Sequence, residues 1–398
     1  LASLGRGGLI VAEDLHWADS GTLEVLDALV DLLPETPTLM LASHRRNEAP
    51  RWQAGLWLGT VRLDPLTEAD GRGIVEAVAG SDAISKALAR EIVRKADGVP
   101  LFIEELTKAI VSTHLPDAGG SDLLRSVVAL PASVPDTLRD LLLARLDQSG
   151  PAKRAAQIGA LVGRSFRHDL LAALGLFAPD DLRPALDALV ALELAQRAGK
   201  GADAVYTFKH ALVQDAAAES LLRRDRRRIH LHIAETLERG ATGAQVAEPD
   251  ELARHFSEAG EPERAARYWE AAGAAALARF ALPEAIAYLR AGMADVHKLP
   301  PSQAREVLDL GLRTRLGPLV VAQHGWGAGE IASVLEPARA LAEPPERTER
   351  LGPILNTLSI HYFSICDMPA SLDCAVRLLE AGAERGDGDL TIVGHRAA

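Results

Sequence analysis

The 398-residue sequence has no long apolar run, few cysteines and few aromatic residues. No run of apolar residues approaches the length of about 18 that a membrane-spanning helix requires, so we expect no membrane partner. Cys366 and Cys374 are its two cysteines, which argues against a disulfide framework and predicts a reduced, cytoplasmic protein. Aromatic residues make up 4% of the chain, while Ala and Leu are abundant. That mixture favours packed helices over β-sandwich cores.

The sequence also lacks a basic excess and a phosphate-binding loop. Its formal net charge is −12 and its pI is about 5.5, which argues against nucleic-acid binding over most of the surface. The pattern G-x-x-x-x-G-K-[ST] does not occur, so these residues alone should neither bind ATP tightly nor hydrolyse it. A buried strand is predicted a few residues after Leu1. Because one strand cannot make a parallel sheet, we expect the chain to be an interior fragment of a longer protein.

Two adjacent acids follow that predicted strand. Residues 9–12 (LIVA) are a short apolar run typical of a strand covered on both faces, and Glu13 and Asp14 come directly after it. A helix over residues 21–33 and a second strand over residues 38–43 complete a βαβ unit with a parallel sheet. Ligand sites in such sheets lie beyond the carboxyl ends of the strands, so this pattern places the acids at a potential ligand site.

The two acids and a nearby arginine suit the binding of a nucleoside triphosphate. Mg²⁺ on a triphosphate is held by phosphate oxygens, waters and one or two carboxylates, and a second acid can polarise the attacking water. Arg45 lies just past the second predicted strand, where a guanidinium can reach a γ-phosphate. From spacing alone, a helix cap with solvated charges explains Glu13 and Asp14 equally well, and Arg45 can equally be a surface loop residue.

The remainder of the chain is predicted to be largely helical. Helices follow Pro65, and one is expected to start at Pro135. Two β-compatible runs flank a turn at residues 199–203, and helices followed by a hairpin are the pattern of a winged helix. Residues 211–239 return to helix. The arginines there favour a solvated helix face over DNA contact, and His230 and His232, two residues apart, make a poor metal pair.

Three helical segments in the C-terminal part echo one another. They read PERAARYWEAAG (262–273), PEAIAYLRAG (283–292) and MPASLDCAVRLLEAG (368–382). Small and apolar residues recurring in this way suggest a tetratricopeptide-like (TPR-like) solenoid, although no strict period of 34 residues holds.

Several segments together resemble one family. In chain order they are LIVAEDLHWAD (9–19), ASHRRNE (42–48), KADGVPLFIEEL (95–106), VPDTLRDLLLARLD (134–147), LVGRSF (161–166), the segment from Tyr206 to Glu238, the segment from Glu251 to Gly292, and residues 308–331. They resemble the Walker B strand, sensor strand, lid, winged helix and first helical repeats of STAND ATPases (signal-transduction ATPases with numerous domains). The similarity is to the bacterial group that carries an adenylate/guanylate cyclase domain. Val99, Ala218 and Glu13 stand where that family usually has Asn, Tyr and Asp.

The resemblance implies a mainly α, multidomain chain. Residues 1–64 would be the C-terminal part of a P-loop α/β ATPase core, 65–125 a helical lid, 126–240 a winged-helix domain and 241–398 TPR-like repeats. It also implies the binding of ATP and Mg²⁺ in the full-length parent. Glu13 and Asp14 would serve Mg²⁺ and water, Arg45 would sense the γ-phosphate, and Pro100 would lie against the nucleotide.

Three functions remain open from the sequence. The first is a fragment of an ATP-driven signalling switch, inactive as an enzyme by itself, whose repeats sense a protein or small-molecule ligand and whose output is a class III adenylate/guanylate cyclase. The second is a LuxR-type transcription regulator, which shares the same middle segments. The third is a non-hydrolysing interaction scaffold. We expect no nucleic-acid contact by this segment and leave open assembly into a homo-oligomer.

Overall fold

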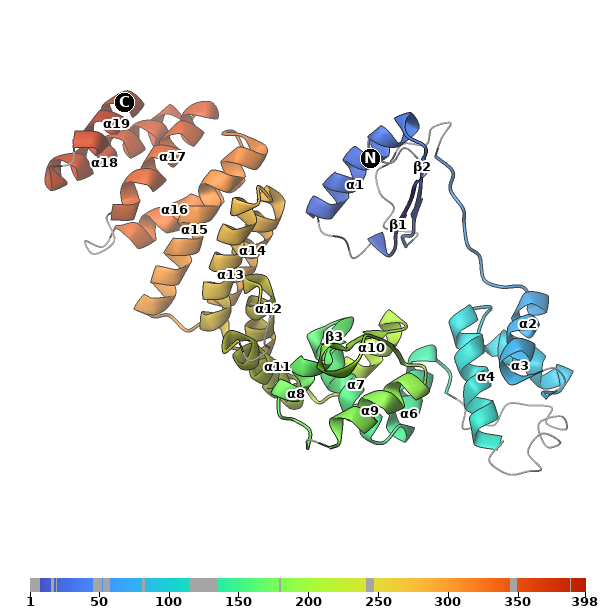
Figure 1. Cartoon of the computed structure of the whole chain (residues 1–398). Coiled ribbons are helices and arrows are strands. Elements are labelled where there is room, and N and C mark those ends of the chain that lie inside the picture. The colour runs from blue at the N-terminus through green and yellow to red at the C-terminus, as the bar shows by residue number, and fades with distance from the viewer. Residues whose placement is uncertain are drawn as a thin grey trace. The chain divides into compact units, whose positions relative to one another are not determined.

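The computed structural model describes residues 8–15, 18, 20–45, 52, 58–80, 83–114, 135–178, 180–240, 247–343, 349–386 and 388–398 (Figure 1). The chain divides into two compact units, residues 1–59 with 246–398 and residues 60–245, and each is described by itself. Helices make up most of the described residues, and the strands among them form two small sheets. None of these helices has both the length and the apolar character needed to cross a bilayer.

The N-terminal part is the expected strand–helix–strand unit. Strand β1 (Gly8–Ala12), helix α1 (Ser20–Leu32) with the short 3-10 turn η2 (Leu33–Glu35), and strand β2 (Thr38–Ala42) follow in order. The strands pair in parallel, with Gly8 opposite Thr38 and Ala12 opposite Ala42. Because the register is even along all five pairs, both strands end at the same edge of the sheet.

Three helices follow the linker after residue 59: α2 (Glu68–Ala79), α3 (Lys86–Lys95) and α4 (Pro100–His114). The Thr67 side chain caps α2 by accepting a hydrogen bond from the Asp70 backbone N–H at 3.2 Å, as the Thr-x-x-Asp pattern suggests. The three helices share one apolar core, which also takes in Leu141 from the next helix. This core includes Leu88, Ile92, Ile103 and Leu106, all 0% exposed. The sequence predicts a looser connection over residues 114–130; its first residue, His114, ends α4, and the rest lies outside the described residues.

A three-stranded antiparallel sheet lies among the next helices. In order the elements are α6 (Leu138–Gln148), α7 (Pro151–Val162), β3 (Ser165–Arg167), α8 (His168–Ala173), α9 (Leu182–Ala191), β4 (Ala195–Ala198), η3 (Gly201–Asp203) and β5 (Val205–Phe208). The strand order is β3-β5-β4. The expected turn at residues 199–203 joins β4 to β5, but β3 and α8 were not predicted. Helix α6 starts at Leu138, capped by Thr137, and not at Pro135 as predicted.

Residues 211–239 are helical as predicted, in two helices. They are α10 (Ala211–Glu219) and α11 (Arg223–Glu238), separated where Leu222 takes an extended backbone conformation. The Gln157 amide on α7 donates to Ser220 Oγ at 2.8 Å, and His232 on α11 lies 2.5 Å from the Leu174 carbonyl oxygen. These bonds hold the end of α10 and the middle of α11 against the sheet-containing part.

The C-terminal part is a succession of helices, each packed on the next. They are α12 (Pro249–Ala259), α13 (Pro262–Ala278), α14 (Leu282–Val296), α15 (Gln303–His324), α16 (Glu330–Ala342), α17 (Leu351–Ser364), α18 (Met368–Arg385) and α19 (Gly388–Ala397). Every helix contacts its neighbours in sequence, and α13, α15, α17 and α19 also contact one another in turn. One continuous apolar core runs from α13 to α18. Such stepwise stacking is the packing of a helical-repeat solenoid.

The unequal repeat lengths explain why no strict period is visible in the sequence. The alternate helices α14, α16 and α18 begin at Leu282, Glu330 and Met368, so the intervals between them differ. Some of the helices also approach one another closely at a glycine. At Gly317 on α15, a Cβ would lie 2.6 Å from a methyl carbon of Leu335 on α16.

Candidate functional site

The two acids directly follow β1 at the carboxyl edge of the sheet. Glu13 is exposed, Asp14 is half-buried and Leu15 is 5% exposed. Asp14 has a φ of +56°, a left-handed conformation that bends the chain immediately after the strand and that Asp tolerates better than most residues. Glu13 and Asp14 therefore lie at the edge where open α/β sheets bind ligands.

Ser43, the residue after β2, connects the two strand ends. Its Oγ accepts a hydrogen bond from the Asp14 backbone N–H at 2.9 Å. Its backbone N–H donates to the Ala12 carbonyl and its carbonyl accepts from the Leu15 N–H, both at 2.9 Å. The bend that carries Asp14 is thus fixed to the neighbouring strand. Sequence reasoning missed Ser43, although a small hydroxyl residue at a strand end was a visible signal.

Arg45 lies two residues beyond Ser43 on the same edge and is exposed. The His44 ring Nδ1 lies 2.8 Å from the Arg45 carbonyl oxygen. The structure therefore brings Glu13, Asp14 and Arg45 to adjacent strand ends of one parallel sheet. Pro100, the fourth residue singled out from the sequence, is exposed and begins α4 in the other unit.

The donor set at this edge suits a triphosphate-bound cation and not an all-protein metal site. Among the described residues no cluster of three or more His, Cys, Asp or Glu side chains could hold a metal. Glu13 and Asp14 offer two adjacent carboxylates, which is the number that Mg²⁺ takes when phosphate oxygens and waters complete its shell.

One face of this small sheet is apolar and exposed. Leu9 and Val11 on β1 are 61% and 57% exposed, and Leu39 and Leu41 on β2 are 59% and 52% exposed. Their alternation places all four on the same face. Parallel sheets are normally covered on both faces, whereas these four side chains are more than half exposed.

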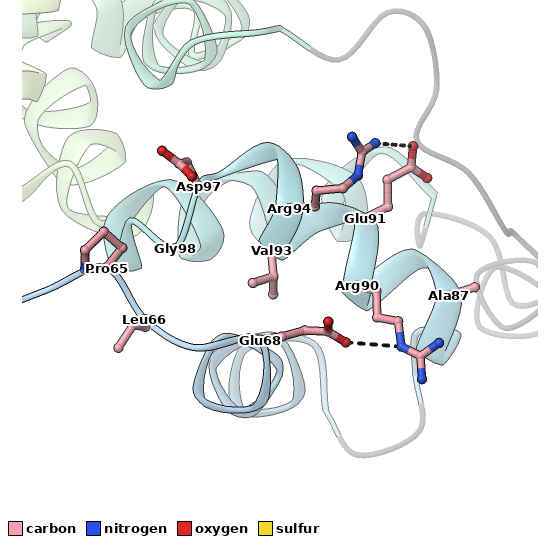
Figure 2. A pocket seen from close by; sticks show the side chains of 10 residues that line it. All are labelled: Pro65, Leu66, Glu68, Ala87, Arg90, Glu91, Val93, Arg94, Asp97 and Gly98. Atoms are coloured by element: carbon pink, nitrogen blue, oxygen red, sulfur yellow. Dashed lines mark ion pairs between the residues drawn. The ribbon is translucent and has the colours of Figure 1, made fainter.

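A second candidate site is an open cavity of about 650 Å³ between the start of α2 and helix α3 (Figure 2). Residues Pro65, Leu66, Glu68, Ala87, Arg90, Glu91, Val93, Arg94, Asp97 and Gly98 line it. Its charged rim is internally paired, with Arg90 Nε 3.2 Å from Glu68 Oε1 and Arg94 Nη2 3.7 Å from Glu91 Oε1.

The turn before Pro100 shapes this cavity. Asp97 and Gly98 have φ values of +49° and +69°, and the Leu66 N–H donates to the Gly98 carbonyl at 2.8 Å. A Cβ at Gly98 would lie 2.7 Å from the Leu66 carbonyl oxygen, so glycine is required there. The cavity-lining arginines were not singled out from the sequence, because a charged helix face normally reads as solvated.

The remaining sequence candidates are not assembled into a site. In the arginine cluster of α11, Arg226 donates to the Ala218 carbonyl at 3.2 Å, and Arg228 lies 3.5 Å from Asp225. His230 is 4% exposed within the core, whereas His232 binds a backbone carbonyl. His16 lies outside the described residues.

Comparisons with known proteins give two similarities. No family model matches the chain. A curated relative, "Uncharacterized protein R02095" of Rhizobium meliloti (strain 1021), is 28% identical over 353 residues, which are 88% of this chain and 33% of that protein. The chain therefore spans about a third of the length of that relative.

A solved structure also overlaps with the chain. It is the crystal structure of a Signal Transduction ATPase with Numerous Domains (STAND) protein with a tetratricopeptide repeat sensor from Pyrococcus horikoshii. The overlap has a TM-score of 0.40 and 11% identity, and it covers 98% of this chain and 64% of that chain. A TM-score of that size does not establish a shared fold.

Proposed function

We propose that the chain is part of a nucleotide-dependent signalling switch of the STAND type. One observation carries the proposal: β1 and β2 pair in parallel with even register, and Glu13, Asp14 and Arg45 follow their carboxyl ends. This is the edge at which α/β proteins bind ligands. The resemblance of the surrounding segments to the Walker B and sensor strands of that family supports ATP as the ligand.

Each residue of the proposed nucleotide site has a separate role. Glu13 and Asp14 would hold Mg²⁺ and orient the attacking water, and Arg45 would contact the γ-phosphate. Bound Mg²⁺ would supply charge neutralisation at the phosphates, in a reaction where positioning and charge stabilisation supply most of the catalysis. The Ser43 bonds to the Asp14 bend fix the backbone that carries the acid. In the resemblance-based assignment, Pro100 would lie against the nucleotide.

The phosphate-binding loop comes from a longer polypeptide in this proposal. The exposed apolar face made by Leu9, Val11, Leu39 and Leu41 supports it, since that face requires covering elements. The pairing of β1 and β2 with each other alone, among the described residues, also supports it, because two strands do not make a stable sheet.

The remaining parts receive these assignments. Helices α2–α4 form the lid, and the segment from α6 to β5 forms a winged helix. From α7 to β5 the order is helix–strand–helix–helix–strand–strand, and this order and the sheet order β3-β5-β4 support the latter. Helices α12–α19 form a TPR-like sensor for a protein or small-molecule ligand. The output is a class III adenylate/guanylate cyclase, which rests on family analogy.

Nucleotide binding by the longer polypeptide tests the switch. Titration of a fluorescent ATP analogue in the presence of Mg²⁺ should saturate, and ADP should compete. Cyclic AMP and cyclic GMP formation, measured in the same preparation, tests the cyclase output separately. A longer polypeptide that carries a phosphate-binding loop and yet binds no nucleotide would leave the interaction scaffold as the function.

A further inference from the structure

Large apolar side chains at the end of α17 and along α18 are exposed on one face of the solenoid, here called the end face. Met368, Leu372 and Val376 are 46%, 51% and 42% exposed. Their spacing of four residues aligns them in one row along α18. Phe363, at the end of α17, is 64% exposed and lines one cavity with Met368 and Leu372, which places it on the same face.

The earlier helices of the same layer carry no such row. Within the described part of the chain, neither α14 nor α16 exposes a large apolar side chain. Their apolar residues lie in the continuous core that runs on to α18, such as Leu289 on α14 and Leu335 on α16, both 1% exposed. Apolar packing surfaces are therefore covered on α14 and α16, whereas the row on α18 is left exposed.

The row lies on the side of α18 turned away from α16. Asp373 Oδ2 accepts a hydrogen bond from Arg339 Nη2 of α16 at 2.6 Å, and Arg377 Nη1 lies 3.3 Å from Oε1 of Glu343, just after α16. The buried row of α18 includes Cys374 and Leu378. At 100° per residue, it has Asp373 and Arg377 on one side and the apolar row on the other. The exposed row therefore faces the direction in which the helix stack would continue.

A cavity of about 430 Å³ adjoins the end face. Residues Ser359, Ile360, Phe363, Met368, Ser371, Leu372, Arg396, Ala397 and Ala398 line it. Because Ala397 and Ala398 are on its rim, any polypeptide that continues from α19 leaves from the cavity itself. The terminal repeat of a solenoid needs a polar outer face for solubility, and the end face does not have one.

We propose that the end face is covered by a further amphipathic helix, contributed by polypeptide that follows Ala398 and stacked on α18 as α18 is stacked on α16. The occupant presents small and aliphatic side chains to Met368, Leu372 and Val376. The Rhizobium meliloti relative is consistent with additional chain, since the aligned part is 33% of its length. This proposal is independent of the nucleotide site.

Thiol accessibility tests the proposal directly. Cys366 is replaced by Ser, and Leu372→Cys is compared with the control Glu384→Cys, an exposed position on α18 that is aligned with Asp373 and Arg377 and not with the apolar row. Maleimide labelling rates are measured in the 398-residue chain and in a polypeptide extended by roughly 40 residues, about one helix pair. Circular dichroism verifies that each variant is folded.

The expected result is a rate for Leu372→Cys at least about tenfold lower in the extended polypeptide, with the rate for Glu384→Cys unchanged. Equal rates for Leu372→Cys in both polypeptides would overturn the proposal. So would a labelling rate in the 398-residue chain that falls as protein concentration rises, because that result assigns the end face to a second copy.

A second variant guards against a fold defect introduced by the cysteine. Leu372→Glu in the extended polypeptide should lower the melting temperature, because it places a carboxylate under the new helix. In the 398-residue chain the same substitution should leave the melting temperature nearly unchanged, since position 372 is half-exposed there. An equal shift in both polypeptides would contradict the proposal.

Discussion

A charge cluster fixes helix α4 to the sheet-containing part, and breaking it should destabilise one unit of the chain selectively. Glu105 on α4 is 6% exposed, and Arg145 on α6 donates to its Oε2. Arg145 also donates to the Leu192 carbonyl, after the end of α9, at 2.6 Å. Lys108 donates to Glu193 Oε2 at 2.5 Å, which ties α4 to the turn after α9.

The ionisation of this cluster is set by its own contacts. Burial alone lowers the pKa of Lys108, but hydrogen bonds to Glu104 and Glu193 outweigh burial and raise it above its ordinary value. The hydrogen bond from Lys108 lowers the pKa of Glu193. Lys108 and Glu193 are therefore charged at neutral pH, and the cluster acts as a set of ion pairs.

Arg145→Met removes the principal partner of a buried carboxylate. Breaking a buried pair costs about 3–5 kcal/mol, but the Arg145 side chain is 17% exposed and Lys108 remains 3.6 Å from Glu105. We therefore expect a loss of about 2–3 kcal/mol in the free energy of unfolding. Glu105→Gln should cost about 1–2 kcal/mol, and the double variant should show a coupling of about 1 kcal/mol or more.

The positions of the tryptophans make the assay selective. All five, Trp17, Trp52, Trp57, Trp269 and Trp326, lie outside residues 60–245. In urea unfolding, circular dichroism follows both units, whereas tryptophan fluorescence follows only the other unit. Arg145→Met should shift the circular-dichroism transition and leave the fluorescence transition unchanged.

The matched control is Arg139→Met on the same helix. Arg139 pairs with Glu219, but the two side chains are 61% and 43% exposed, so its loss should be below about 1 kcal/mol. Equal effects of Arg139→Met and Arg145→Met, or a fluorescence transition that shifts with Arg145→Met, would refute the reasoning.

Three further predictions follow from local contacts. A Cβ at Gly159 on α7 would lie 2.5 Å from the buried Phe166 ring, so Gly159→Ala should lower the free energy of unfolding by about 1–3 kcal/mol, measured in a circular-dichroism melt. The control Gly73→Ala, with nothing within 4 Å of the added Cβ, should raise the free energy of unfolding by up to about 1 kcal/mol. A stabilising Gly159→Ala would exclude this packing. Burial raises the pKa of the Cys374 thiol to about 11, so a thiol reagent at pH 8 should modify exposed Cys366 and not Cys374, with mass spectrometry of peptides as the readout; equal modification would contradict the buried position. The hydrogen bond from Arg167 lowers the pKa of Asp169 below 3.8. This carboxylate therefore contributes stability that is fully present above pH 3.8 and is lost as pH falls through its pKa in the folded protein. The stability difference between the wild type and Asp169→Asn should vanish towards low pH, and a difference independent of pH would refute the assignment.

Element type was predictable where the sequence carried both a period and a boundary signal. The apolar runs at residues 9–12 and 38–43 are strands, and the Gly98-Val99-Pro100 break separates α3 from α4. Strand β3 was missed because three residues show no alternation. The start of α6 was misplaced because Pro135 was taken as its first turn, whereas Thr137 accepts the Asp140 N–H and caps it.

The candidate site was predictable only in outline. Glu13 and Asp14 stood out because two adjacent acids directly follow an apolar strand. The Ser43 connection and the left-handed bend at Asp14 depend on strand register, which a single sequence does not specify. The cavity between α2 and α3 arises from a turn that brings Gly98 back to Leu66, a contact between residues more than thirty positions apart.

Metal binding in the longer polypeptide tests the central claim most directly. Mn²⁺, used with ATP in place of Mg²⁺, reports its own binding through electron paramagnetic resonance. Asp14→Asn should weaken Mn²⁺·ATP binding by about tenfold or more, whereas Glu35→Gln, an exposed carboxylate before β2 at the opposite edge of the sheet, should leave it unchanged. Equal affinities for the wild type and Asp14→Asn would contradict a nucleotide site at the carboxyl edge of β1 and β2.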